Sequence, residues 1–124
     1  MGANLHASCI SYCQYGILIL GPSGSGKSDL CLRMIMDKGA TLIADDRVDV
    51  TACGNQLEAG CPQNIEGLLE IRGIGISKFP YQKKCPLRLA VKLAASPQEI
   101  ERMPQDSFFE FEGVKLPQIT LWPF

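Results

Sequence analysis

The chain has 124 residues, 46% of them hydrophobic and 20% charged, and its formal net charge is −1. This length and composition are typical of one globular domain, which we expect to span residues 1–124. A net charge so close to zero excludes a broad attraction to nucleic acid or to an anionic membrane. The longest apolar runs are too short to span a bilayer, and the N-terminus lacks the pattern of a secretory signal, so we predict a cytoplasmic location.

The cysteines are consistent with that compartment. Six are present, none of them in a Cys-x-x-Cys pair, and His6 is the single histidine. Cys9 and Cys13 give weak support for a zinc site, because no matching second pair accompanies them. We therefore expect reduced cysteines that serve as small apolar residues.

The first predicted elements are a strand pair, a glycine-rich loop and a helix. Leu5–Tyr12 has the composition of a strand that pairs with a second strand, Gly16–Leu20. The next residues match the phosphate-loop motif G-x-x-x-x-G-K-[ST]. They are Gly21, Pro22, Ser23, Gly24, Ser25, Gly26, Lys27 and Ser28. In this context backbone amides would surround the phosphates of ATP, Lys27 would reach the outer phosphates, and the Ser28 hydroxyl would bind Mg²⁺.

The helix is expected over Asp29–Lys38, directly after the loop. Asp29, Arg33 and Asp37 recur at every fourth position and form one polar stripe with favourable opposite charges. Nearly every other position is apolar, which predicts burial along most of the girth of the helix. Gly39 suits the C-terminal cap.

Two adjacent carboxylates follow the next predicted strand, Thr41–Ala44. Asp45 and Asp46 stand at its carboxyl end, where ligands bind in open α/β sheets. Their mutual repulsion favours a bound cation. The alternative is a solvated turn capped by aspartate. Glu70 is a weaker candidate, because a lone glutamate between apolar residues usually lies on the wet face of a strand.

The rest of the chain predicts short strands with few helices, and so an α/β fold with a mixed sheet and one main crossover helix. The expected elements are a hairpin (Val48–Cys53 and Gln56–Glu58), a loop (Gly60–Gly67), strands Leu68–Ile71 and Ile74–Ile76, an exposed connection (Phe79–Pro86), a strand (Leu87–Ala95), a short helix with a capping box (Ser96–Met103) and closing strands Phe108–Phe111 and Val114–Trp122.

Three segments together with the phosphate loop resemble the HPr kinase/phosphorylase family. They are Leu42–Asp49, Leu69–Ile76 and, late in the chain, Pro117–Leu121, and His6 stands before the loop as it does in that family. The resemblance runs from about residue 5 to 121 and covers only the C-terminal catalytic domain, so the chain looks like a short form. It implies a phosphate-loop kinase domain with a fold similar to phosphoenolpyruvate carboxykinase.

The resemblance also implies a function. Family members phosphorylate a serine of the phosphocarrier protein HPr with ATP, in a Mg²⁺-dependent reaction, and also phosphorolyse phosphoserine to give pyrophosphate. By position, the implied roles are Asp45 as catalytic acid/base, Asp46 as supporting carboxylate, His6 as orienting residue, Lys27 as catalytic phosphate ligand, Ser28 and Glu70 near the metal, and Arg72 as a supporting residue. An oligomer is compatible with the resemblance.

Two other functions stay open from the residues alone. One is a phosphate-loop kinase of a small metabolite, and the other is a non-enzymatic nucleotide sensor. The arginine that longer family members place near the transferred phosphate has no motif match here. Lys83, Lys84 and Arg88 are the candidates for its role.

Overall fold

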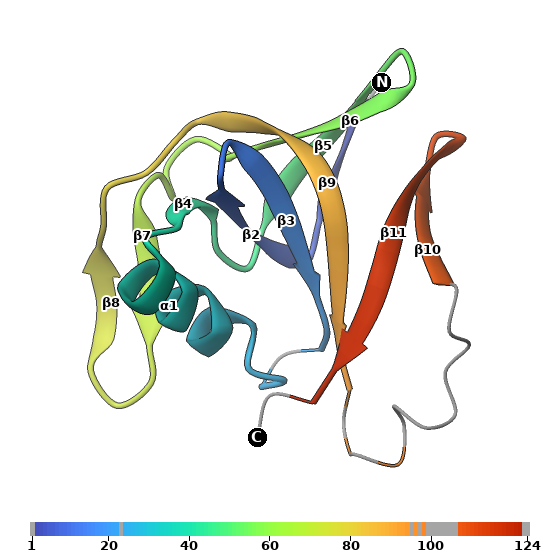
Figure 1. The fold of residues 1–124 in the computed structure, drawn as a ribbon. Coiled ribbons are helices and arrows are strands. Elements are labelled where there is room, and N and C mark those ends of the chain that lie inside the picture. Colours follow the sequence, from blue (N-terminus) through green and yellow to red (C-terminus); the bar gives the residue numbers. More distant parts are fainter. Residues whose placement is uncertain (1, 23, 95, 97, 99–106, 123–124) are drawn as a thin grey trace.

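The computed structural model describes residues 2–22, 24–94, 96, 98 and 107–122, which form a curled sheet with a helix on one face (Figure 1). In chain order, the elements of these residues are β1 (Gly2–Leu5), β2 (Ala7–Tyr12), β3 (Tyr15–Leu20), α1 (Lys27–Lys38), β4 (Thr41–Ala44), β5 (Val48–Cys53), β6 (Gln56–Gly60), β7 (Leu68–Ile71), β8 (Gly75–Lys78), β9 (Lys84–Leu93), β10 (Ser107–Phe111) and β11 (Val114–Leu121).

The long strand β9 organises the sheet. The strand order is β1-β5-β6-β9-β3-β2-β4. β6 pairs with the start of β9, β11 pairs with its end, and β3 runs along it in parallel. The β9–β11 pair is also parallel, whereas the other pairs are antiparallel. The predicted mixed sheet is therefore confirmed. Because β9 changes partners along its length, the sheet curls around it (Figure 1).

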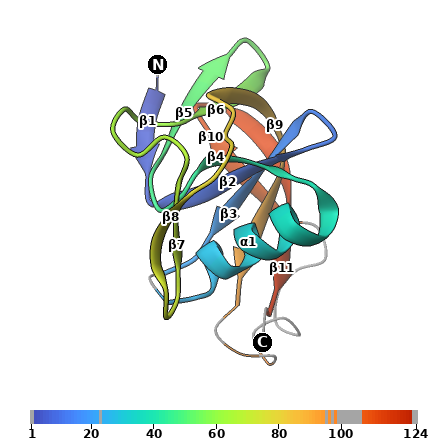
Figure 2. The same cartoon turned by 90° about the vertical axis from the view of Figure 1, so that its left-hand side faces the viewer.

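The core has two parts, one on each face of the central strands. Successive side chains of a strand point to opposite faces, so Leu18 and Ile19 of β3 are both fully buried but in different parts. Leu18 packs inside the curl with residues of β5 and β6, such as Val50. Ile19 packs beneath α1 with Cys31 of that helix. Figure 2 shows α1 lying across β2 and β3.

The predicted strand Leu5–Tyr12 is wrong as a single element, because the chain changes partners at His6. Gly2–Leu5 pairs with β5 on one side of the curled sheet. Ala7–Tyr12 pairs with β3 and β4 on the other side. His6 therefore stands at a corner between two strands, where its side chain is free to face the end of β4.

The expected burial of the helix is also wrong. Only Lys27 and Cys31 of α1 are buried, and the side chain of Met36 is 70% exposed. The sheet and the β7–β8 ribbon cover α1 only in part, so Met36 faces solvent. The apolar residues of the helix that pack against the core while remaining partly accessible are Leu30, Leu32, Met34 and Ile35. The cap at Gly39, with φ of 74°, is confirmed. In the described part of the chain, no helix has the length and apolar character needed to cross a membrane.

Residues 80–84 are exposed, as the polar sequence of Phe79–Pro86 predicts, but the segment is bonded to β4 and its last residues already belong to β9. Tyr81 forms a parallel bridge with Leu42, and the backbone N–H of Gln82 donates to the Leu42 carbonyl at 2.9 Å. The segment therefore runs along the free edge of β4 before β9 begins at Lys84. The predicted helix of residues 96–103 lies largely outside the described residues.

Candidate active site

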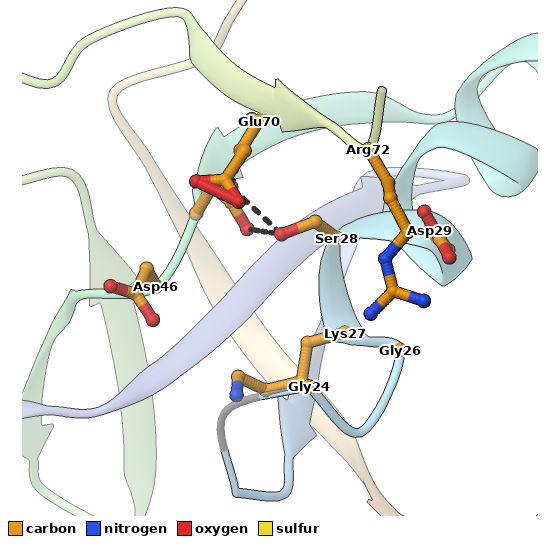
Figure 3. Close-up of a pocket in the computed structure, with 9 residues that line it drawn as sticks. Gly24, Gly26, Lys27, Ser28, Asp29, Asp46, Glu70 and Arg72 are labelled. Carbon is orange, nitrogen blue, oxygen red and sulfur yellow. Dashed lines mark hydrogen bonds between the residues drawn. The ribbon is translucent and has the colours of Figure 1, made fainter. Parts of the chain in front are cut away.

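A cleft of about 240 Å³ opens where the phosphate loop, the end of β4 and the β7–β8 ribbon meet (Figure 3). Its lining residues are Gly24, Gly26, Lys27, Ser28, Asp29, Asp45, Asp46, Glu70 and Arg72. The sequence separates these residues by up to 48 positions. The fold brings them together because α1 packs against β4 and β7.

The phosphate loop has the backbone geometry that its glycines permit. Gly26 begins α1 with φ of 103°, a left-handed conformation that glycine adopts without strain. A Cβ atom at Gly21 would lie 2.5 Å from Oγ of Ser25, so only glycine fits beneath the loop. The Lys27 side chain is buried, and its amine donates to the carbonyls of Gly21 at 2.8 Å and Pro22 at 3.1 Å. Ser23 lies outside the described residues.

Ser28 and Asp45 are directly bonded. The Ser28 hydroxyl donates to the carboxylate of Asp45, with oxygen distances of 2.8 and 3.0 Å (dashed lines in Figure 3). Asp45 is nearly buried, and its carboxylate also accepts from Oγ of Ser8 at 2.8 Å and from the backbone N–H of Glu70 at 3.2 Å. The three donors fix the carboxylate at the floor of the cleft. The Asp45 carboxylate is therefore not part of a solvated turn, which was the alternative interpretation of the paired aspartates.

Asp46 differs from its neighbour because its side chain is exposed. One carboxylate oxygen lies 2.7 Å from Nε2 of His6, and the Asp46 side chain is 64% exposed against 39% for His6. The Asp46 backbone has φ of 71°, an unusual value for a residue other than glycine. Its N–H donates to Oγ of Ser8 at 3.0 Å. Two adjacent carboxylates therefore sit in different environments, one fixed inside the cleft and one paired with histidine at its rim.

The β7–β8 ribbon forms the opposite wall. Leu69 is fully buried beneath α1, which anchors the ribbon and leaves Glu70 and Arg72 on its other face. Both side chains point toward the phosphate loop (Figure 3). Arg72 is the arginine among the described residues that lines the cleft. Arg88 instead stacks on Tyr15, 4.8 Å from the ring centroid.

The other two candidates for a phosphate-binding cation also lie elsewhere. Neither Lys83 nor Lys84 is among the lining residues. The Lys84 amine faces Glu58 at 4.0 Å. The sequence could not exclude these residues, because their distance from the loop depends on the path of the segment before β9.

The donor set fits a magnesium ion held together with phosphates. Hydroxyl and carboxylate oxygens of Ser28, Asp45 and Glu70 face the cleft, and Mg²⁺ prefers oxygen ligands. Among the described residues no three His, Cys, Asp or Glu side chains gather to hold an ion alone. Mg²⁺ commonly needs only one or two carboxylates when substrate phosphates supply the rest. The volume suits a phosphate chain and an ion, since whole-ligand pockets measure roughly 300–1,000 Å³.

Cys31 lies beneath the cleft but remains a neutral thiol. Burial raises the pKa of Cys31 well above its usual range, and the charge of Asp45 raises it further. All six cysteines are free in the structure; Cys9, Cys31 and Cys85 are buried as expected of small apolar residues, whereas Cys13 and Cys53 are exposed. Cys31 therefore serves as a small apolar residue of the core.

The sequence analysis missed Ser8 and Asp29. Asp29 lies in the first turn of α1 and lines the cleft. It had been interpreted only as part of a polar stripe. Ser8 is fully buried and bonds to both carboxylate residues. The one available signal was a hydroxyl within an otherwise apolar run, two residues after His6.

The fold is of the mixed α/β class, with a curled sheet and a cleft at one end of the helix. The model of the HPr Serine kinase C-terminal domain family matches residues 2–122. The chain therefore belongs to that family. A solved structure of the Hpr(Ser) kinase/phosphatase from Coxiella burnetii is similar to it with a TM-score of 0.84 and 29% identity, over 97% of this chain and 85% of that one.

Curated relatives share the same region. HPr kinase/phosphorylase from Burkholderia lata is 34% identical over 96% of this chain, and that from Burkholderia cenocepacia is 33% identical over the same share. The chain spans 40% of the length of each of these relatives.

Proposed function

We propose that the chain transfers the γ-phosphoryl group of ATP to a serine hydroxyl of HPr, the protein named in its relatives. The observation that carries the proposal is the bonded pair of Ser28 and Asp45 beside the buried Lys27 amine. In phosphate-loop enzymes the loop lysine and serine hold the phosphates and their metal, and in kinases a carboxylate accepts the proton of the substrate hydroxyl. The family membership supports the same reaction.

The chain's own residues would bind and orient the nucleotide. ATP and Mg²⁺ supply the phosphoryl group and the charge that offsets it in the transition state. Lys27 and the loop amides would hold the outer phosphates, and Arg72 would approach them from the ribbon. The Ser28 hydroxyl can keep its hydrogen bond to Asp45 while its oxygen lone pairs face the ion. Glu70 would add a carboxylate oxygen from the opposite wall of the cleft.

Asp45 would accept the proton of the serine hydroxyl. The serine oxygen forms a bond to the γ-phosphorus, the bond from that phosphorus to the β-bridging oxygen breaks, and ADP leaves. Three donor groups make four contacts with the carboxylate, two on each oxygen, because the Ser28 hydroxyl is shared between both oxygens. The acceptor hydroxyl would take one of the two positions that Ser28 shares. Asp46 and His6, paired at the rim, would orient the incoming serine.

The reverse reaction uses the same groups. An oxygen of inorganic phosphate would attack the phosphorus of phosphoserine while its proton passes to Asp45. The bond from that phosphorus to the serine oxygen would break, Asp45 would give the proton to the serine oxygen, and pyrophosphate would form. Little need be rebuilt, since phosphoryl transfer depends mainly on positioning and charge. We also propose that residues 1–124 act as one catalytic domain of the phosphate-loop, phosphoenolpyruvate carboxykinase-like type, and that the reaction occurs in the cytoplasm, where ATP is available.

The test is incubation of the chain with γ-labelled ATP, Mg²⁺ and purified HPr, with phosphoserine identified by mass spectrometry. An HPr variant whose acceptor serine is replaced by alanine is the control. Label on HPr but not on the variant supports the proposal. ATP binding without transfer to any protein would contradict it and favour a nucleotide sensor, whereas transfer to a small hydroxyl compound alone would identify a metabolite kinase.

A further inference from the structure

We propose that Ser8 is a positioning residue that holds Asp45 and Asp46 in their two different environments. The inference rests on the proposed function, because it assigns Ser8 a part in the same transfer reaction. Its evidence is independent of that function: a fully buried hydroxyl contacts two consecutive residues of the cleft.

The place of Ser8 in the sheet explains these contacts. It lies on β2, opposite Ile19 of β3. On the other edge of β2, the ladder to β4 has Cys9 opposite Ala44, the last residue of β4. Ser8 is therefore next to the point where β4 ends and Asp45 begins. A side chain here reaches the first residues beyond the strand.

The Ser8 hydroxyl is used in both directions. It donates to Oδ1 of Asp45 at 2.8 Å and accepts from the backbone N–H of Asp46 at 3.0 Å. The first bond orients the carboxylate that also holds Ser28. The second satisfies an amide that the end of the ladder would leave without a partner, and it fixes the turn in which Asp46 has φ of 71°.

A single segment therefore holds the carboxylate pair. His6, two residues before Ser8, contacts the Asp46 side chain at 2.7 Å from outside, while Ser8 contacts its backbone from inside. Loss of the inner contact would free the turn that carries Asp46 and would remove one of the three groups that orient the Asp45 carboxylate. The residues around Ser8 on β2 are apolar, so a hydroxyl at this buried position is stabilised by these two partners.

The purely structural alternative predicts a different result. If Ser8 only satisfies polar groups of the core, Ser8→Ala lowers stability, and each folded molecule keeps its full turnover. If Ser8 positions the carboxylates, turnover falls in molecules that still bind nucleotide. Partners that orient functional groups in this way typically change activity by roughly 10–100-fold when they are replaced.

The experiment compares wild type, Ser8→Ala, Ser8→Thr and Ser11→Ala. Ser11 is the matched control, because it is also a buried serine of β2 but lies at the far end, opposite Gly16 and Thr41. The measurements are kcat for HPr phosphorylation, the Kd for ATP with Mg²⁺, and hydrogen exchange of the Asp46 amide. Calorimetric binding stoichiometry corrects kcat for the folded fraction.

We expect Ser8→Ala to lower the corrected kcat by about 10–100-fold with little change in Kd. Exchange of the Asp46 amide should rise by about tenfold, since its acceptor is lost. Ser8→Thr restores the hydroxyl and should recover most of kcat, and Ser11→Ala should resemble wild type.

An unchanged corrected kcat in Ser8→Ala, or a folded Ser8→Thr as slow as Ser8→Ala, would overturn the proposal. Failure of the underlying function gives a different result, because wild type itself then transfers no phosphate to HPr. In that case the hydrogen-exchange rate of the Asp46 amide still tests the role of Ser8. A faster rate in Ser8→Ala, but not in Ser8→Thr or Ser11→Ala, supports positioning, and an unchanged rate refutes it.

Discussion

Lys27 is buried with its amine on two carbonyls of its own loop, although its proposed partners are phosphates. We predict that Lys27→Ala removes nucleotide-dependent phosphorylation and leaves the protein folded. The lysine is the first residue of α1 and its amine bonds to loop carbonyls, which can bind water once it is removed. Thermal unfolding by circular dichroism and the rate of HPr phosphorylation test both parts.

Lys38→Ala is the matched control, since Lys38 is exposed in the last turn of the same helix. It should keep the wild-type rate. Equal rates in wild type and Lys27→Ala would refute the assignment of the loop.

Asp45 and Asp49 allow a comparison of a fixed and an exposed carboxylate. We predict that Asp45→Asn slows transfer by roughly 10²–10⁴-fold, the usual contribution of a general base, while ATP affinity is kept. In Asp45→Asn the side-chain NH₂ group would face one of the three donors that now bond to the carboxylate. The lost hydrogen bond should lower the free energy of unfolding by about 1–3 kcal/mol.

Asp49→Asn is the control, because Asp49 is exposed and bonds only to Asn4 among the contacts described. Rates at saturating ATP and Kd values by calorimetry separate the two possible roles of Asp45. If affinity for ATP with Mg²⁺ falls as much as the rate, Asp45 acts as a metal ligand and its assignment as base is wrong.

Among the elements, the β7–β8 ribbon has a special position, because it carries Glu70 and Arg72 on a two-stranded sheet of its own. Leu69 anchors it under α1, and Leu57 is an equally buried leucine inside the curl. Leu69→Ala and Leu57→Ala should each lower stability by about 2–5 kcal/mol. Only Leu69→Ala should also slow transfer per folded molecule, since it loosens one wall of the cleft.

Chemical denaturation and the transfer rate, corrected for folded protein, test this prediction. Equal corrected rates in both variants would show that the ribbon does not depend on Leu69 for its position.

Elements with a local signal could be predicted from the sequence. The left-handed glycine that begins α1, the helix cap at Gly39 and the turn between β5 and β6 depend on glycine geometry within a few residues. Other features depend on tertiary contacts. The break at His6 follows from the curl of the sheet, and the path of Phe79–Pro86 follows from the free edge of β4. Neither leaves a pattern in the chain.

The same division applies to the site. The motif and the paired aspartates predicted Lys27, Ser28, Asp45 and Asp46, and the family resemblance added His6, Glu70 and Arg72. The structure places these residues around one cleft, with His6 bonded at its rim. Sequence could not show that the two aspartates differ in burial, because that difference arises from Ser8 on another strand.

For the whole molecule, the buried thiols predict how stability depends on pH. Burial raises the pKa of Cys31 well above the ordinary value of 9.0, so the folded state keeps a proton that the unfolded chain releases. The stabilisation is complete below the unfolded pKa and is lost as pH rises above it, with a slope of at most about 1.4 kcal/mol per pH unit for each such thiol. Burial likewise raises the pKa of Cys61 to about 11.

Urea unfolding between about pH 8 and pH 10 tests this linkage. The free energy of unfolding should fall with pH in wild type and less steeply in Cys31→Ala. Cys13→Ala is the control, since Cys13 is exposed. Identical slopes in wild type and Cys31→Ala would contradict the prediction.

The central claim is that this cleft transfers phosphate from ATP to a protein serine, and the most direct measurement is the initial rate of phosphoserine formation on HPr. The rate should be measured with ATP and Mg²⁺ for wild type and Lys27→Ala side by side. We expect phosphoserine with wild type and none above background with Lys27→Ala. No phosphoserine with wild type, under conditions in which calorimetry shows ATP bound, would contradict it.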